Sequence, residues 1–389
     1  MTKLIAFVSL ALALVACRGS QRSTLPPRPT TGTVPTQGPT PKITWQKIES
    51  PDDVPREPPA VGTYRVHMID VGTGLAILLQ GHDFNLLYDA GTNDPGEKPL
   101  RVVSYLAHAI GPSGDDTCVA KGATAPTQRL RLDHVVLSHP HLDHGSALDL
   151  VVHCYDVGHV WDSGRINEAA FYRDFLTAVG ASATAVYHTA ADVPSNRVVA
   201  VKGAEVKIAR WERFSESDTV KLGEAATFTI LHAEAKQLRD PNQNSVVIVV
   251  DLGGARVLLV GDAESGDRKH PDEAPGDVEQ FLLDHHATAV RADILQVGHH
   301  GSKTSSRRAF LTAVKPSVAL VSSGPKRYGK VTLPDVEVLG ALEQLGAKIL
   351  RTDERDADCP VTRRIGGDTG PGGCDSFVIT IEPTAPAAR

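Results

Sequence analysis

The chain has 389 residues, of which 41% are hydrophobic, and its formal net charge at pH 7 is -6. This length is enough for one large domain or two small ones. The modest acidic balance argues against a protein that coats nucleic acid over its whole surface, although it leaves room for a local basic groove.

The first 17 residues are typical of an export signal. Lys3 precedes a short apolar run over residues 4–15, and Leu14-Val15-Ala16-Cys17 has the small-residue pattern of a cleavage site. The run is shorter than the roughly 20 apolar residues that a membrane-spanning helix needs. It resembles a bacterial lipoprotein signal, which implies that Cys17 is lipidated and attaches the protein to a membrane. The alternative is an ordinary secretory signal, and in either case we expect a protein exported to the bacterial cell envelope, lipid-anchored or secreted.

Residues 18–60 are rich in Pro, Thr, Ser, Gly and Gln, apart from an apolar patch around Trp45. This composition predicts an extended tether, because it offers too little apolar surface for a core. Nothing in the interior of residues 61–383 has the composition of a second linker. We therefore expect one domain there, with insertions.

The first half of this domain begins with strands. Residues 64–70, 75–80 and 84–88 are predicted strands, and glycines beside their ends would present Asp70 and Asp89 at tight turns. Residues 99–110 have the pattern of an amphipathic helix, and residues 111–128 read as a loop insertion.

The strongest motif follows the apolar run Val135-Val136-Leu137, in the stretch Ser138-His139-Pro140-His141-Leu142-Asp143-His144. Imidazoles and a carboxylate suit zinc, or manganese where more oxygen ligands join. The run before the motif predicts a strand and the residues after it predict a helix start. His139 and His141 would then project to one side while Asp143 and His144 turn to a neighbouring point, which predicts two adjacent metal sites.

The second half repeats the arrangement of strand, glycine and ligand. Residues 226–231, 245–251 and 255–260 are predicted strands, and the last of them ends in Gly261-Asp262. A carboxylate in this position can approach two metals with one oxygen each, so Asp262 is a candidate bridging ligand. The next apolar strand, over residues 294–297, leads to Gly298-His299-His300-Gly301-Ser302.

The pattern His139-x-His141-x-Asp143-His144 resembles the signature of the metallo-β-lactamase superfamily. Asp70-Val-Gly-x-Gly, the strand that ends in Asp89-Ala-Gly and the His-His-Gly-Ser stretch resemble the ComEC-like group of competence proteins in particular. The resemblance implies an αββα sandwich, in which two mixed sheets lie face to face with helices outside and metals at the sheet edge. It also implies that Asp89 supports the metal site from behind.

The same resemblance suggests His299 as the last ligand, beside Asp143 and His144, with His300 behind it or in contact with substrate; the two roles could be exchanged. We expect only one of them to ligate, because adjacent side chains on a strand point to opposite faces. The wider superfamily has another histidine before the bridging aspartate, whereas this chain has Asp240-Pro241-Asn242. Asn242 could supply an oxygen ligand or a hydrogen bond, His232 is a weaker candidate, and a plain turn is equally possible.

A basic stretch suggests the substrate. From residue 294 to residue 334 there is no acidic residue. The same stretch contains the basic residues Lys303, Arg307, Arg308, Lys315, Lys326, Arg327 and Lys330. Such charges beside metals would attract a polyanion, and Ser302 could donate to a phosphate oxygen. The alternative is that the basic side chains lie on a solvated helix face.

Four cysteines follow Cys17, an even number that suits an oxidising compartment. Cys359 and Cys374 bracket a loop and are the preferred pair, which leaves Cys118 with Cys154. Three connectivities are possible, so this pairing is a preference.

Two metals can lower the pKa of a shared water towards about 7 and hold attacking and leaving oxygens. We therefore expect a hydrolase that uses a metal-held hydroxide, with Asp143 orienting the water or accepting its proton. Extracellular nucleic acid is the favoured substrate, and no protein partner can be inferred. A hydrolase of a lactone, thioester or β-lactam, and a binding module that has lost metal affinity, are the alternatives.

Overall fold

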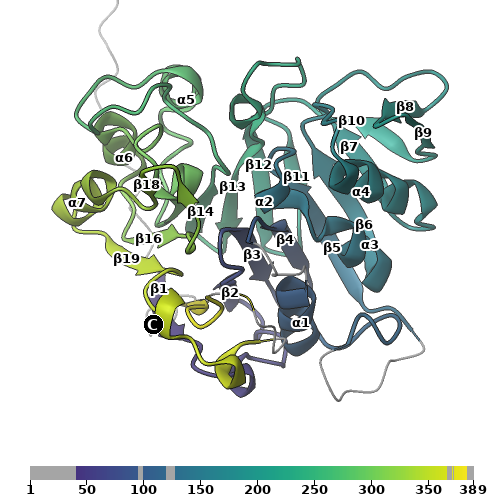
Figure 1. Cartoon of the computed structure of the whole chain (residues 1–389), viewed down its shortest axis with the longest axis horizontal. Helices are drawn as coiled ribbons and strands as arrows, with labels where there is room; N and C mark the ends of the chain where they lie inside the picture. The colour runs from purple at the N-terminus through teal and green to yellow at the C-terminus, as the bar shows by residue number, and fades with distance from the viewer. Residues whose placement is uncertain (1–40, 95–99, 120–127, 366–369, 371, 383–389) are drawn as a thin grey trace, which may run out of the picture. The chain divides into compact units, whose positions relative to one another are not determined.

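Two β-sheets form the centre of the protein (Figure 1). The computed structural model describes residues 41–94, 100–119, 128–365, 370 and 372–382. The first sheet has the strand order β1-β20-β2-β3-β4-β5-β6-β7-β10. Its strands are β1 Lys42–Lys47, β2 Tyr64–Met68, β3 Gly74–Gln80, β4 Asn85–Thr92, β5 Arg131–Leu137, β6 Asp156–Asp162, β7 Val186–Thr189, β10 Trp211–Arg213 and β20 Phe377–Glu382. Strands β4, β5, β6, β7 and β10 run parallel to one another, and the other strands of this sheet pair antiparallel.

The second sheet has the order β11-β12-β13-β14-β15-β16-β19, antiparallel as far as β14 and parallel beyond it. Its strands are β11 Thr219–Lys221, β12 Ala226–His232, β13 Val247–Leu252, β14 Ala255–Leu259, β15 Ile294–Gln296, β16 Val318–Val321 and β19 Lys348–Arg351. Two hairpins lie outside the sheets, one formed by β8 Val198–Val201 and β9 Ala204–Lys207, the other by β17 Arg327–Tyr328 and β18 Val331–Thr332.

Helices cover the outer face of each sheet. They are α1 Leu100–Ala109, α2 Leu142–Gly145, α3 Leu148–Cys154, α4 Ala170–Ala181, α5 Asp277–His286, α6 Arg308–Val314 and α7 Val336–Gln344. Short 3-10 turns occur at Pro51–Asp53, Pro241–Asn244, Gly298–Gly301, Asp356–Asp358 and Val361–Arg363. In Figure 1, α1, α3 and α4 lie on one side of the sheets, and α5, α6 and α7 lie on the other.

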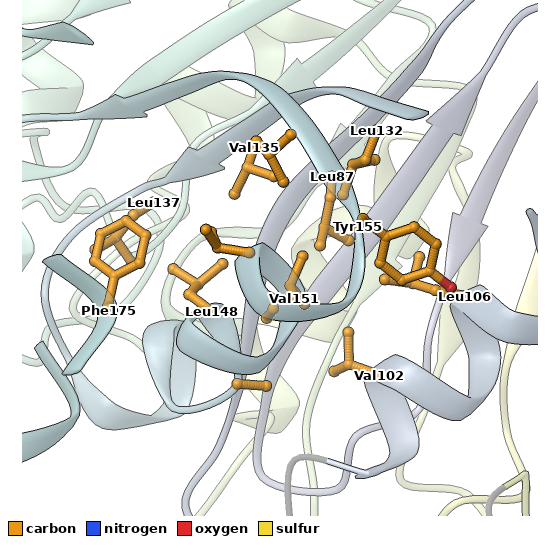
Figure 2. Packing of buried hydrophobic residues seen from close by; sticks show 14 of the residues in the cluster. Leu87, Val102, Leu106, Leu132, Val135, Leu137, Leu148, Val151, Tyr155 and Phe175 are labelled. Carbon is orange, nitrogen blue, oxygen red and sulfur yellow. The ribbon is translucent and has the colours of Figure 1, made fainter. Parts of the chain in front are cut away.

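The hydrophobic residues divide into three cores that match these layers. Val135 and Leu137 of β5 pack outwards against α1, α3 and α4, together with Leu148 and Phe175 (Figure 2). Val136, between them in sequence, points instead into the core between the two sheets. A strand covered on both faces needs such a continuous apolar run, which is why the residues before the histidine motif are all hydrophobic. The layers confirm the predicted αββα sandwich.

The predicted tether is too long at its C-terminal end. Residues 42–47 form β1, which pairs with β20 along its whole length, and Ile48 and Val54 are buried in the core behind the first sheet. The apolar patch around Trp45 was the signal for this strand. The predicted signal, Cys17 and most of the tether lie outside the described residues.

Residues 151–154 form the end of α3, where their apolar side chains pack on the outer face of the first sheet. Both disulfides have the preferred pairing, Cys118 with Cys154 and Cys359 with Cys374. Among the described residues, no helix is long and apolar enough to cross a membrane.

Candidate metal centre

The predicted ligands come together where parallel strands of both sheets end. His139 follows β5, Asp262 follows β14 and His300 follows β15, while α2 carries Asp143 and His144. Loops after parallel strands meet at one edge of a sheet, so residues far apart in sequence become neighbours there.

One carboxylate oxygen is central to the cluster. Asp262 Oδ2 lies 3.2 Å from Nε2 of His144, 3.6 Å from Nε2 of His300 and 3.9 Å from Nε2 of His139. Nε2 of His139 lies in turn 2.9 Å from Nδ1 of His141. Nitrogen and oxygen atoms that converge in this way suit a divalent transition metal.

Within this cluster, the potential ligand atoms form two groups. His139, His144 and Asp262 make one, and Asp143, His144 and His300 make the other, with the atoms of each group within 4.8 Å of one another. His144 belongs to both, so the two groups are adjacent.

Asp89 fixes the orientation of the first histidines. Its carboxylate is fully buried and accepts from the main-chain N–H of Ser138 at 2.7 Å and from the Ser138 hydroxyl at 2.7 Å. The same carboxylate lies 2.7 Å from Nδ1 of His144. The proton on His144 is therefore held at Nδ1, and Nε2 is left free to face Asp262. This is the geometry that the expected supporting role of Asp89 requires.

The main chain of α2 rests directly on the strands. A Cβ atom on Gly91 would lie 2.5 Å from the carbonyl carbon of Asp143, and one on Gly74 would lie 2.7 Å from the carbonyl oxygen of Asp143. No side chain fits between these elements. The two glycines thus set how closely Asp143 and His144 approach the rest of the cluster.

His299 and His300 exchange the expected places. Both have left-handed backbone angles, with φ of 47° and 53°, so they form a tight turn and not the end of a strand. His300 is buried and its Nδ1 donates to the carbonyl of Ser322 at 2.8 Å, which leaves Nε2 facing Asp262 and, 3.9 Å away, Asp143. The geometry favours His300 beside Asp143 and His144, the exchange that the sequence left open.

His299 contacts a carboxylate that sequence reasoning gave no role. Its Nδ1 lies 2.7 Å from Glu264 and 2.7 Å from the hydroxyl of Thr304, while its Nε2 lies 3.8 Å from Asp262. Glu264 follows Asp262 by two residues, and this spacing could have been recognised as a second carboxylate at the same strand end. His299 therefore lies at the rim of the cluster.

The charges of the cluster are strongly coupled. Burial alone would lower the pKa of His144, but Asp262 and Asp89 outweigh it and raise that pKa well above its usual value. Burial would raise the pKa of Asp262, yet His144 and the two later histidines hold it well below its usual value. Burial would likewise lower the pKa of His299, but Asp262 and Glu264 raise it to about 9. The carboxylates thus favour positive charge at this point.

The residues near the absent histidine are less clearly placed. Asn242 is buried in the turn at Pro241–Asn244, where its main-chain N–H bonds to Asp240, and its side-chain oxygen has no hydrogen-bond partner among the described residues. Asn242 therefore stays a candidate oxygen donor. His232 bonds to the carbonyl of Ser245 and packs on Phe281, so it is directed away from the cluster.

The structure corrects the predicted role of Lys303, Arg307 and Arg308 as contacts to a substrate. Arg307 is fully buried and donates to the main-chain carbonyls of Asp267, Lys269 and Lys303, so it supports the loop and cannot contact a substrate. Lys303 pairs with Glu337 and Arg308 pairs with Asp272. Ser302 is also buried and accepts from Arg268. Lys303, Arg307, Arg308 and Ser302 thus all have partners within the protein. Of the alternative, a solvated helix face, only Arg308, which is 31% exposed, and the exposed Lys315 lie at the ends of α6.

Several buried atoms of the cluster lack partners of their own. Nε2 of His144, Nε2 of His300 and Oδ1 of Asp262 make no hydrogen bond within the described part of the chain. Buried polar atoms are nearly always bonded, and a metal ion would satisfy all three. The donor set of imidazoles and carboxylates, oriented by Asp89 and by the Ser322 carbonyl, therefore fits a divalent metal.

The sequence of this chain is similar to those of several known proteins. The family model described as the metallo-beta-lactamase superfamily matches residues 69–324. "Recombination protein 2" of Haemophilus influenzae is 27% identical over 292 residues, which are 75% of this chain and 28% of the relative. "Competence protein ComA" of Neisseria gonorrhoeae is 26% identical over 303 residues, 78% of this chain and 32% of the relative. "ComE operon protein 3" of Bacillus subtilis is 29% identical over 168 residues, 42% of this chain and 20% of the relative.

The chain thus spans about a third or less of the length of these relatives. Among solved structures, the metallo-beta-lactamase fold protein YhfI from Bacillus subtilis is similar at 12% identity and a TM-score of 0.42, covering 75% of this chain and 96% of that protein. The relatives confirm the resemblance to competence proteins. The family match spans both histidine clusters and Asp262, and the chain belongs to the metallo-beta-lactamase superfamily.

Proposed function

We propose that the protein is a metal-dependent hydrolase that cleaves phosphodiester bonds of extracellular nucleic acid. The observation that carries the proposal is the convergence of imidazole nitrogens on Asp262, each from a ring whose position is fixed elsewhere. His144 is held by Asp89 and His300 by the Ser322 carbonyl, so their free nitrogens face the same carboxylate. Zinc is the first candidate for the two divalent ions and manganese the second.

In this proposal, His139 and His141 would hold one ion, with Asn242 as a further oxygen donor. Asp143, His144 and His300 would hold the other, and Asp262 is the candidate ligand shared by both sites. Bound divalent ions would supply Lewis-acid polarisation of the scissile bond and an acidified water. We assign to Asp143 the role of orienting that water or accepting its proton; the 13% exposure of its side chain supports this assignment.

Nucleic acid is favoured as the substrate by two observations. The matched relatives are named as competence and recombination proteins. In addition, the hairpin of β17 and β18 carries Lys326, Arg327 and Lys330, none of which pairs with a carboxylate within the described ranges. Within the predicted basic stretch, these three cations are therefore the candidate phosphate contacts, in preference to Lys303, Arg307 and Arg308.

The test is hydrolysis by the purified protein, after removal of metal with a chelator and reloading with zinc or manganese. Single-stranded DNA, duplex DNA, RNA and bis(p-nitrophenyl) phosphate would be compared with a β-lactam, a lactone and a thioester. We expect metal-dependent cleavage of the phosphodiesters, abolished in Asp262→Ala and His144→Ala. Hydrolysis of a small ester or β-lactam without phosphodiester cleavage would refute the substrate class. Failure to bind metal would favour a binding module.

We also propose export and attachment to a membrane through lipidated Cys17. Support comes from the signal-like residues 1–17 and from the two disulfides, which persist in oxidising compartments. In the bacterial host, the wild-type protein should partition into the detergent phase of Triton X-114 and incorporate labelled palmitate. Cys17→Ser should do neither. A wild-type protein that is recovered without lipid in the medium would support the ordinary secretory signal instead.

A further inference from the structure

The hairpin of β17 and β18 is anchored beside the candidate metal centre. The main-chain N–H of Lys326 donates to the hydroxyl of Thr73 at 3.1 Å, and the hydroxyl of Ser322 donates to the carbonyl of Gly74 at 2.7 Å. The carbonyl of Ser322 also holds His300, so the segment that leads into the hairpin is part of the support of the cluster. The position of the hairpin is therefore coupled to the position of the ligands.

Tyr328, at the tip of β17, belongs to the same neighbourhood. Burial and then the negative charges of Asp143 and Asp262 raise the pKa of its phenol far above the usual value, which agrees with a short distance to the cluster. The residue still has 38% of its surface exposed. An aromatic ring that is both exposed and close to a reaction centre is available to a substrate.

A cavity of about 260 Å³ lies between this ring and the metal-binding loop. Tyr328, Val331 and Leu333, from the hairpin and the residue after it, line the cavity together with Arg268, His299, Ser302 and Thr304. The residues from the hairpin are aromatic or apolar, while the others carry polar groups. A flat heteroaromatic ring with polar edges has the chemistry that matches such a cavity.

The charges on the hairpin match the backbone that would accompany such a ring. The ammonium group of Lys326 lies 5.2 Å from the centre of the Tyr328 ring. Arg327 and Lys330 are exposed on the same hairpin. By contrast, the basic residues of the loop after His300 already have partners: Lys303 pairs with Glu337, Arg308 pairs with Asp272, and Arg307 donates to main-chain carbonyls. Lys326, Arg327 and Lys330 are thus the cations of this stretch that lie on the same hairpin as Tyr328.

We propose that this cavity receives one unstacked base of a single-stranded nucleic acid, with Tyr328 as the stacking platform and the hairpin cations on the adjoining phosphates. A base inside a duplex is stacked and paired, so it cannot enter without being extruded, whereas a base of a single strand can. Tyr328 therefore makes the enzyme select single strands over duplexes. This inference rests on the proposed phosphodiesterase function and assigns its substrate class.

The test compares Tyr328→Ala and Tyr328→Phe in the full-length, metal-loaded protein. Three substrates separate stacking from chemistry: a single-stranded oligonucleotide, the same oligonucleotide in a duplex, and bis(p-nitrophenyl) phosphate, which has no base. Trp45→Ala is the matched control, because Trp45 is another exposed aromatic residue but lies on the edge strand β1.

We expect wild type to cleave the single strand in preference to the duplex. Tyr328→Ala should lower kcat/KM on the single strand about tenfold or more, mainly through KM, as loss of one base–aromatic stack implies. Hydrolysis of bis(p-nitrophenyl) phosphate should stay within about twofold, and Tyr328→Phe and Trp45→Ala should both resemble wild type. An equal loss on all three substrates, or no preference in wild type, would overturn the proposal.

A binding measurement keeps this inference separate from the proposed function. Fluorescence anisotropy with a labelled single strand, carried out in chelator so that no cleavage occurs, should show weaker binding by Tyr328→Ala and not by Trp45→Ala. Binding that depends on Tyr328, without any phosphodiester hydrolysis by the loaded enzyme, would refute the proposed function alone. If the loaded enzyme hydrolyses phosphodiesters but Tyr328→Ala binds the single strand as well as wild type does, the stacking site alone would be refuted.

Discussion

The two histidine clusters face the same carboxylate but are held in different ways. In the first cluster, the imidazole of His144 is backed by the buried carboxylate of Asp89. In the second cluster, the imidazole of His300 is backed by a neutral carbonyl, that of Ser322. A carboxylate makes an imidazole a stronger donor to a metal than a carbonyl does. The first cluster should therefore dominate metal affinity, while the second completes the site.

The largest expected combined effect, on stability and on metal binding together, comes from removing the carboxylate behind the first cluster. Asp89→Ala leaves a buried histidine and both donors of Ser138 without their acceptor. We expect a loss of about 3 kcal/mol in the free energy of unfolding and roughly 10–100-fold weaker metal binding. Urea unfolding of the metal-free protein and competition with a chromophoric chelator would measure the two effects. Asp89→Asn, which keeps an acceptor, should lie in between, and metal binding like wild type in Asp89→Ala would contradict the comparison.

A comparable loss of stability is expected from a change in the loop that follows the second histidine cluster, at a residue that does not contact the candidate metal ligands. Arg307→Ala removes the donors of three main-chain carbonyls in the loop after the histidines, and we expect about 3 kcal/mol of destabilisation. Lys303→Ala breaks only a partly exposed pair with Glu337 and should cost under about 1 kcal/mol. Urea unfolding of both variants would measure the two free energies of unfolding for comparison with wild type. If the two variants were equally stable, Arg307 would not have the structural role assigned to it.

The third prediction compares the adjacent histidines. His300→Ala should weaken the second metal by more than the roughly 100-fold upper range typical of residues behind a ligand. His299→Ala should weaken it less, because His299 faces Glu264 and lies at the rim. Metal content after dialysis and chelator competition would distinguish them. The reverse order would restore His299 as the ligand.

The smallest effect concerns a histidine outside both clusters. Burial, followed by the charge of Arg65, lowers the pKa of His67 to about 3. Above pH 6.5 both folded and unfolded states are neutral at this ring. Between pH 6.5 and 3 only the unfolded state gains the proton, so stability falls by about 1.4 kcal/mol per pH unit.

His67→Gln, which can still bond the hydroxyl of Tyr105, should reduce that slope by about one proton. Urea unfolding at a series of pH values from 6 to 4.5 would measure the slope for both proteins. An unchanged slope would mean that His67 does not remain neutral in the folded protein.

Much of the first half could be predicted from the sequence because its signals are local. The apolar run before Ser138 has to be a strand covered on both faces, and His139 to His144 follow it directly. The second half depends on contacts that the sequence does not contain. The left-handed turn at His299 and His300 reverses the expected facing, and it is stabilised by distant groups such as the Ser322 carbonyl.

Charge was the least predictable property. Lys303, Arg307 and Arg308 lie in a stretch of the sequence that has no acidic residue, yet their partners include residues 267–272 and 337, which are remote along the chain. The strand β1 was missed for a related reason, since its pairing partner β20 lies more than 300 residues away. Local pattern can indicate a site, but it cannot indicate which charges the fold will neutralise.

The disulfide between Cys118 and Cys154 has a consequence for metal binding before folding. Its sequence separation is 36 residues, and the whole stretch from Ser138 to His144 lies between the two cysteines. The first histidine cluster is therefore part of a closed covalent ring that persists when the protein unfolds. Because the ring restricts the unfolded chain, it keeps His139, His141, Asp143 and His144 at a high local concentration. The oxidised unfolded chain should retain some affinity for metal, so a bound ion stabilises the fold by less than its affinity for the native site alone implies.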